Sequence, residues 1–317
     1  MSVLRRKRVV PAAVDLSARI GTVTLPNPIL TAAGTAGHGA ELRPYFDLSE
    51  LGAVVVKSIS AEAWCGNPAP RVAEVVAGMI NSVGLQNPGV DRWLANDLPE
   101  LRSLGARTVA SIWGFTVDEY EAVATRLRGA GVVAVEVNVS CPNIEDRRHM
   151  FAHSSEGTAK VIAAARRGLG PDVALWAKLS PNVTALTDIA AAAIEAGADA
   201  LTLVNTVMGM VIDTEARRPK LGAGGGGVSG PAIRPVAVRA IYETRRAHPD
   251  VPIVGAGGVA HGVDAVELLM AGANAVEVGT ATFYEPAAPH RVLTELREWC
   301  IRHGIVTLDE LIGAAHG

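Results

Sequence analysis

The residues of this chain best suited to chemistry lie between positions 138 and 143. One thiol, Cys141, stands between the carboxamides of Asn138 and Asn143, and Pro142 stops the apolar run that precedes them. A carboxamide both donates and accepts hydrogen bonds, so such a pair can hold a polar planar molecule while a thiolate moves a proton. The same residues also fit a turn that closes a strand, with Cys141 as a small buried hydrophobe. Taken alone, the segment does not decide between the two interpretations.

Polar residues also stand at or near the ends of other apolar runs. They are Lys57, Ser111, Asn138, Lys178, Asn205 and Thr206. One lysine at such a place is usually a surface residue with a covered stem and a solvated charge. Two lysines and two asparagines that end separate runs instead predict one functional site, because the ends of parallel strands converge.

Glycines follow the last two apolar runs, in Gly257-Gly258 and in Gly279-Thr280. Glycine lets backbone N–H groups approach a phosphate closely, so these positions predict a phosphate site. The glycine-rich segment 222–227 superficially resembles a dinucleotide fingerprint, but no strand precedes it and Pro231 follows. We expect it to be a flexible part of a loop.

Predicted strands and helices alternate along the chain, and they must position these residues. Thr116 and Glu119 have capping-box spacing at a helix start, Gly131 marks its stop, and a second helix is expected at 183–196. Eight short apolar runs have the character of strands buried on both faces of a parallel sheet: 28–33, 53–57, 108–112, 133–138, 174–179, 200–205, 252–256 and 275–279. This alternation predicts an α/β fold, a (β/α)8 TIM barrel, with the polar strand ends on its C-terminal face.

The remaining segments complete a single-domain prediction. Residues 20–25 are expected to form a small N-terminal hairpin with upstream residues, below the first strand. Three long connections, 58–90, 143–155 and 206–230, follow strands and therefore stand on the C-terminal face. The basic run at 5–8 predicts a solvated tail over residues 1–13, and residues 14–317 form the barrel domain.

Composition excludes several classes of function. With 29 basic and 32 acidic residues and a net charge of −3, the chain is not expected to bind nucleic acid or an anionic membrane. Three cysteines are too few for a disulfide framework, and no apolar run is long enough to span a bilayer, so we expect a cytoplasmic protein. Cys65 is interpreted as a loop thiol and Cys300 as a side chain that packs against its neighbours. The histidines lack metal-ligand spacing and no CxxC cluster occurs, so no metal site is expected.

Together these motifs resemble the class 1 dihydroorotate dehydrogenases. Class 2 is less similar, because it has serine at the place of Cys141 and carries a membrane-associating N-terminal helix. Within class 1, segment 81–89 most resembles subclass 1B, the catalytic subunit of the NAD-linked enzyme. The motifs occur in family order from about Val14 to the C-terminal helix: Lys57-Ser58, 81–89, 138–143, Gly257-Gly258 and Gly279-Thr280.

The resemblance implies FMN bound across the mouth of the barrel. A cation beside the flavin ring stabilises negative charge there, which is the role implied for the two lysines. At two positions this chain departs from the family, with alanine in place of a flavin-contacting serine and serine in place of asparagine; these are Ala33 and Ser111. The implied cofactor-binding residues are Ala33, Lys57, Ser58, Ser111, Asn138, Lys178, Val204, Gly230, Gly257, Gly258, Gly279 and Thr280.

The implied activity is oxidation of (S)-dihydroorotate to orotate in de novo pyrimidine biosynthesis. Cys141 would be the general base that removes the C5 proton while hydride passes from C6 to the flavin; a free thiol has a pKa near ~8.5, so its surroundings must favour the thiolate. The implied partners are a second copy of the chain and, in subclass 1B, a separate FAD and iron–sulfur subunit that reduces NAD. The implied substrate-binding residues are Lys57, Asn81, Ser82, Val83, Gly84, Leu85, Asn138, Asn205 and Thr206.

Three alternatives stay open at the level of sequence. Segment 144–153 is charged where family loops carry glycines, which favours a related flavin barrel acting on another pyrimidine or planar ring. Ala33 and Ser111 favour a non-catalytic subunit that only binds FMN or a partner. The glycines after the last two strands also fit a phosphate-binding barrel isomerase without flavin.

Overall fold

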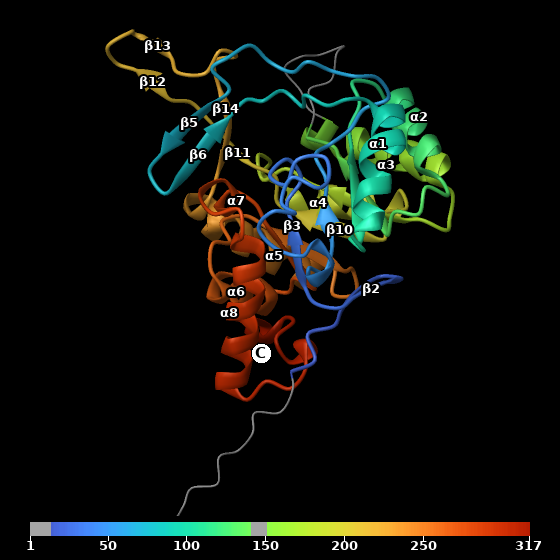
Figure 1. Ribbon diagram of the computed structural model, residues 1–317, viewed down its shortest axis with the longest axis vertical. Coiled ribbons are helices and arrows are strands. Elements are labelled where there is room, and N and C mark those ends of the chain that lie inside the picture. Colours follow the sequence, from blue (N-terminus) through green and yellow to red (C-terminus); the bar gives the residue numbers. More distant parts are fainter. Residues whose placement is uncertain (1–13, 141–150) are drawn as a thin grey trace, which may run out of the picture.

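The structure is a computed structural model that describes residues 14–140 and 151–317 (Figure 1). The expected solvated tail at 1–13 lies outside the described residues. So do Cys141 and the charged segment that follows it, up to Met150. Their predicted roles therefore stay predictions from the sequence.

The predicted (β/α)8 barrel is confirmed within the described residues. Eight parallel strands follow one another in chain order around the barrel, the eighth pairs with the first, and a bridge between Leu30 and Ala53 joins the first to the second. The strands are β3 (Ile29–Thr31), β4 (Val54–Val55), β7 (Thr108–Ile112), β8 (Ala134–Asn138), β9 (Ala174–Lys178), β10 (Ala200–Leu203), β15 (Ile253–Ala256) and β16 (Ala275–Val278). Most strands are a residue or two shorter than predicted, and the polar residues Asn138 and Lys178 close the β8 and β9 ladders, whereas Lys57 and Asn205 lie just beyond their strands.

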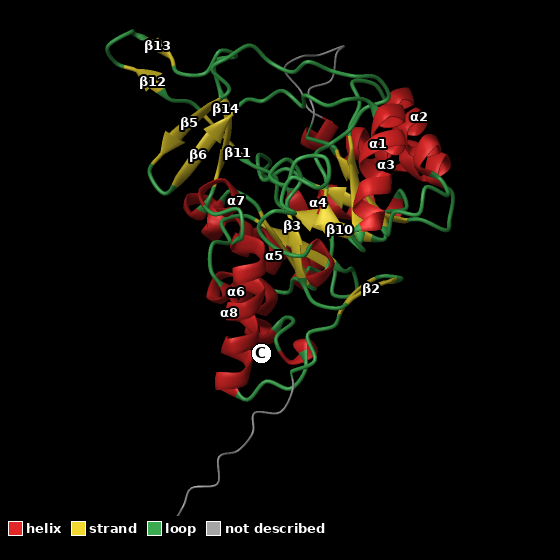
Figure 2. Cartoon of the chain, viewed as in Figure 1, coloured by secondary structure: helices red, strands yellow, loops and turns green. Residues whose placement is uncertain are grey.

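Helices surround the strands and bury one apolar face each (Figure 2). In α2 (Val117–Leu127) the buried residues Tyr120, Val123, Ala124 and Leu127 follow helical spacing. Its predicted cap is present in part: Thr116 accepts from Glu119 N at 3.3 Å, while the Glu119 carboxylate accepts from Phe115 N. The other helices are α1 (Val90–Ser103), α3 (Ser155–Leu169), α4 (Leu186–Glu195), α5 (Arg234–Ala247), α6 (Gly262–Met270), α7 (Ala281–Tyr284) and α8 (Ala288–His303), with short 3-10 turns η1 (Leu48–Glu50), η2 (Phe151–His153), η3 (Pro231–Ile233), η4 (Leu308–Glu310) and η5 (Ala314–His316).

Two of the long connections build a second sheet beyond the barrel mouth. Strands β5 (Val72–Val75) and β6 (Gly78–Asn81) come from the connection after β4, and β11 (Val207–Gly209) and β14 (Gly226–Ser229) come from the one after β10. They form a four-stranded antiparallel sheet in the order β11-β14-β6-β5, which Figure 1 shows at one end of the barrel. The hairpin β12 (Ile212–Asp213) and β13 (Arg218–Pro219) extends from it. We call this four-stranded unit the mouth sheet.

The mouth sheet corrects one sequence-based expectation. Segment 222–227 was expected to be flexible loop, but its last two residues, Gly226 and Gly227, begin β14. A Cβ on Gly226 would collide with Asn81 O, and one on Gly227 would collide with Thr206. Gly226 therefore allows close packing against the connection after β4, and Gly227 allows it against Thr206 in its own connection.

The predicted N-terminal hairpin is also present. Strand β1 (Ala18–Ile20) pairs antiparallel with β2 (Val23–Leu25), ahead of β3. Among the described residues, no helix has the length and apolar character needed to cross a membrane.

Candidate active site

A cavity of about 760 Å³ lies at the barrel mouth, between the C-terminal strand ends and the mouth sheet. This size is in the range typical of sites for drug-sized ligands and cofactors. With the exception of Ser111, every described residue that the sequence marked as cofactor- or substrate-binding lines it. These are Ala33, Lys57, Ser58, Asn81, Ser82, Val83, Gly84, Leu85, Asn138, Lys178, Val204, Asn205, Thr206, Gly230, Gly257, Gly258, Gly279 and Thr280.

Ser111 lies one layer behind the cavity wall. Its side chain is fully buried, and its hydroxyl is 2.9 Å from that of Ser58, which does line the cavity. Ser111 therefore reaches a ligand only through Ser58. On the same side, Lys57 folds against Gly34, where an added Cβ would lie 3.2 Å from Nζ.

One end of the cavity is a glycine turn after β15. Gly257 and Gly258 have φ values of 137° and 76°, which other residues rarely adopt. An added Cβ would lie 2.7 Å from the Cβ of Ala237 at the first position and 2.6 Å from that of Arg234 at the second. Opposite this turn, Thr280 donates to Ser229 at 2.8 Å and so ties the end of β16 to the mouth sheet. We call this end of the cavity the glycine cradle.

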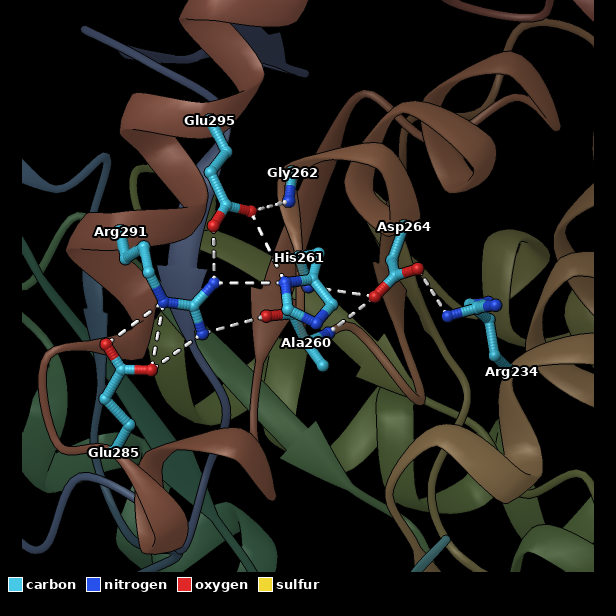
Figure 3. Close-up of polar contacts among 8 residues, drawn as sticks. All are labelled: Arg234, Ala260, His261, Gly262, Asp264, Glu285, Arg291 and Glu295. Carbon is cyan, nitrogen blue, oxygen red and sulfur yellow. Dashed lines mark hydrogen bonds and ion pairs between the residues drawn. The ribbon is translucent and has the colours of Figure 1, made fainter.

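Charged side chains from α6 and α8 hold the segment after the glycine cradle (Figure 3). Arg291 donates to Ala260 O at 3.1 Å, and Glu295 accepts from Gly262 N at 2.6 Å. Asp264 accepts from the backbone of Ala260 and His261 at 2.9 and 2.8 Å. Residues 260–262 are thus fixed from two helices, and the cradle is fixed with them.

Two acidic residues compensate the positive charge of Arg291. It bonds Glu285 through two nitrogens at 2.8 to 3.0 Å and Glu295 at 2.6 Å. Hydrogen bonding to Glu285, helped by Glu295, raises the pKa of the Arg291 guanidinium despite partial burial. We therefore interpret Arg291 as a clamp on the loop.

The floor of the cavity is a buried charge cluster. Lys178 Nζ lies 2.8 Å from Glu277 Oε2 and 3.4 Å from Glu136 Oε1, and all three side chains are buried. Burial alone would lower the pKa of the Lys178 ammonium, but the two acidic groups outweigh it and raise that pKa. The sequence singled out Lys178 but missed Glu277, although an acidic residue within an apolar strand was a signal.

The two predicted substrate asparagines contact each other on the opposite wall. Asn205 donates to Asn138 Oδ1 at 3.2 Å, and that oxygen also accepts from Ser140 N at 3.1 Å. The buried hydroxyl of Tyr120 donates to Asn138 O at 2.7 Å and anchors the end of β8. The pair is therefore oriented by the protein before any ligand binds.

A third wall comes from the connection after β4. Asn67 donates to Ser82 Oγ at 2.8 Å, and Trp64 donates to Gly84 O at 2.9 Å. Trp64, Trp113 and Phe115 pack edge to face with ring centroids 4.6 to 6.4 Å apart. Sequence reasoning missed these aromatic residues, even though two of them directly follow β7.

The cysteines differ in their surroundings. Cys300 on α8 is buried, and burial raises the pKa of its thiol, so its predicted packing role is confirmed. Cys65 is an exposed loop thiol, as expected. Cys141 lies outside the described residues and directly follows Ser140, which lines the cavity.

Comparison with known proteins places this site in a family. The family model described as dihydroorotate dehydrogenase matches residues 15–299. A relative from Desulforudis audaxviator, named dihydroorotate dehydrogenase B (NAD(+)), catalytic subunit, is 48% identical over 96% of this chain and 98% of its own. One of the same name from Trichlorobacter lovleyi is 44% identical over 95% and 99%.

A third relative, from Solibacter usitatus, is 47% identical over 94% of this chain and 98% of its own. Its name assigns it provisionally to dihydroorotate dehydrogenase A (fumarate). The relatives thus share the dehydrogenase name and differ in the acceptor that their names give. Because the family model and the relatives align along nearly the whole chain, it belongs to the dihydroorotate dehydrogenase family, as its motifs predict.

Proposed function

We propose that this chain binds FMN and oxidises (S)-dihydroorotate to orotate in de novo pyrimidine biosynthesis. The family to which it belongs is flavin-dependent. The observation that carries the proposal is the convergence of the glycine cradle, Lys178 and the Asn138–Asn205 pair on one cavity. This combination suits a long cofactor with a phosphate at one end and a planar ring at the other.

The residues present fit FMN rather than a smaller ligand. Side chains at Gly257 and Gly258 would collide with Ala237 and Arg234 on α5, so only glycines permit this turn, whose backbone N–H groups can approach a phosphate. At the other end, the Lys178 ammonium supplies positive charge beside the ring position. Bound FMN supplies the two-electron acceptor for the reaction.

We assign the remaining residues by the side of the cavity that they occupy. Lys57, Ser58, Val204 and Gly230 border the flavin ring, with Ala33 beside them and Ser111 acting through Ser58. Substrate lies against Asn138, Asn205 and Thr206 on one side and against residues 81–85 on the other. Carboxamides suit this substrate because its ring presents both N–H donors and carbonyl acceptors.

Cys141 is the proposed base. Its Sγ would accept the proton from C5 of the substrate as hydride leaves C6. Its place in the sequence supports this role, because Asn138 and Ser140 just before it line the cavity. A thiolate at this position needs surroundings that favour its charge.

For electron delivery we propose the subclass 1B arrangement, with NAD as final acceptor. It rests on relatives named catalytic subunit of an NAD(+) enzyme. The chain would form a homodimer and assemble into a heterotetramer with an FAD and iron–sulfur subunit in the cytoplasm. Turnover with fumarate by the isolated chain, without that subunit, would favour the acceptor named for the Solibacter relative instead.

The central test is anaerobic addition of dihydroorotate to the purified yellow protein. We expect the flavin absorbance to bleach in the wild type. Cys141→Ala should abolish bleaching while FMN stays bound. Cys65→Ala is the matched control and should bleach normally, because Cys65 is exposed and is not part of the cavity wall.

Two results would redirect the assignment. A flavin that dihydroorotate leaves oxidised, but that another pyrimidine bleaches, would favour the alternative motivated by the charged segment 144–153. A yellow protein without turnover on any ring or dye would favour a binding subunit. A colourless protein that FMN cannot restore would contradict the flavin assignment altogether.

A further inference from the structure

The barrel interior holds three charged residues that the family motifs leave unexplained as a group. Within the eight described barrel strands, Glu136 on β8, Lys178 on β9 and Glu277 on β16 are the only charged side chains. Glu136 and Lys178 come from neighbouring strands. Glu277 comes from β16, which β10 and β15 separate from β9 in the sheet, so its side chain reaches across the interior.

The charges of this cluster do not balance if every group is ionised. Two carboxylates and one ammonium would leave a net negative charge in a place with no water-exposed side chain, which is costly. The neighbouring strands supply only uncharged residues beside the cluster, such as Ser111, Thr202 and Ala256. Lys57 also lines the cavity, but from the connection after β4.

The hydrogen bonding points to where a proton sits. Glu136 Oε2 and Glu277 Oε1 are both buried, and neither has a partner among the described residues. The two carboxyl groups contact the same ammonium, Glu277 at 2.8 Å and Glu136 at 3.4 Å, and so lie close together. An ionised carboxylate only accepts hydrogen bonds, so a bond between two of them needs a proton on one.

Burial and the closeness of Glu136 also raise the pKa of Glu277 well above its ordinary range, and Lys178 offsets them only in part. In such a pair the proton belongs to both groups. One shared proton brings the net charge of the cluster to zero and supplies a donor for a buried oxygen that otherwise lacks one.

We propose that Glu136 and Glu277 share one buried proton and hold the Lys178 ammonium in a neutral cluster at the floor of the cavity, with Glu277 as the positioning residue for that lysine. The proton pair stands independently of the proposed function. Only its effect on a bound flavin rests on that function. Glu277 fixes Lys178 from across the barrel, and the shared proton keeps negative charge away from the ring position.

The first test is infrared spectroscopy of the full chain at neutral pH, with glutamate labelled by carbon-13. We expect a C=O band of a protonated glutamic acid that shifts with the label. Either Glu277→Gln or Glu136→Gln should remove it, because the remaining carboxylate then pairs with Lys178 alone. Asp264→Asn is the control: this buried acid pairs with Arg234, and the band should persist.

A wild type without the band would overturn the proposal. So would a band that survives in both single variants. Using two variants guards against one of them failing to fold.

The second test measures the midpoint potential of the bound flavin. Glutamine reproduces a protonated glutamate, so Glu277→Gln should keep the wild-type potential to within a tenfold change in equilibrium constant, about 30 mV for a two-electron couple. A midpoint potential more than about 30 mV above that of the wild type would mean that Glu277 is ionised in the wild type, which would contradict the proposal. Glu277→Ala should release Lys178 and weaken flavin retention at least tenfold, and Glu277→Gln should restore it.

The two tests separate the two claims. A chain that shows the band but binds no flavin contradicts the proposed function and leaves the proton pair standing. A chain that bleaches with dihydroorotate but lacks the band contradicts the proton pair alone.

Discussion

At the scale of single residues, Lys178 at the floor of the cavity shows how a charged side chain is stabilised away from solvent. Lys178 is surrounded by apolar strands, yet Glu136 and Glu277 make its charged form the stable one. Removing one member of a buried ion pair leaves the others uncompensated. The buried negative charge of the cluster therefore depends on Lys178 for compensation.

Replacing this lysine should be costly. Lys178→Gln should lower the free energy of unfolding by about 3–5 kcal/mol, because it leaves acidic groups buried without their cation. Urea denaturation of the flavin-free chain measures this. Lys160→Gln is the control, since its ion pair with Glu156 is solvent-exposed, and it should change little. Equal effects of the two variants would show that the buried cluster stabilises the fold no more than an exposed ion pair does.

The raised pKa of Glu277 also predicts a pH dependence of stability. The folded chain keeps a proton that the unfolded chain releases above the ordinary glutamate pKa, about 4.3. Stability should therefore fall as pH rises from there towards the raised pKa, by up to about 1.4 kcal/mol per pH unit relative to Glu277→Gln. Urea titrations of both proteins at pH 5, 6 and 7 measure the difference, and parallel curves would contradict it.

At the scale of elements, the ends of strands and helices decide what the cavity offers. Polar residues stand at the ends of β8 and β9 and just beyond those of β4 and β10, and α6 and α8 fix the loop after β15. The cradle is thus held by side chains from α6 and α8, one of which, Arg291, also lines the cavity. Changes on α8 should reach the cofactor through that loop.

Arg291 tests this clamp. Arg291→Gln should weaken FMN binding roughly tenfold, about 1.4 kcal/mol, because segment 260–262 loses its anchor to α8. Quenching of flavin fluorescence on binding to the flavin-free chain measures the dissociation constant. Arg239→Gln, which breaks an exposed pair with Glu243 on α5, should leave it unchanged. An unchanged constant for the Arg291 variant would show that the clamp is dispensable.

The sequence predicts an element well when residues close together in the chain determine it, and poorly when its partners lie far away in the chain. The barrel strands were predictable because each is a short, mostly apolar run, and two of them end at a polar residue, Asn138 or Lys178. The mouth sheet was not, because β14 pairs with β6 across well over a hundred residues and its glycines have no apolar periodicity. Glu277 was missed for the same reason: its partner Lys178 lies on a distant strand.

At the scale of the whole molecule, cofactor binding should be coupled to folding. The cavity takes walls from most of the barrel and from the mouth sheet, so an occupied site resists unfolding of both. FMN at one hundred times its dissociation constant should stabilise the chain by about 2.7 kcal/mol. Riboflavin at the same concentration should stabilise it less, because it lacks the phosphate that the glycine cradle is proposed to bind. Thermal unfolding with each ligand measures this, and equal shifts would argue against the cradle.

The mouth sheet has a consequence for how this enzyme family can be diversified. Its ladder joins β14 to β6 through backbone groups, and Gly227 pairs with Asn81 directly opposite. The side chain of Asn81 can therefore change without breaking these backbone pairs, and Thr206, which packs against Gly227, can be exchanged for side chains of similar size. The glycine turn after β15 comes from a different connection. Libraries that vary these two positions should yield altered substrate preferences on an intact flavoprotein scaffold, which makes the sheet an exchangeable module for protein engineering.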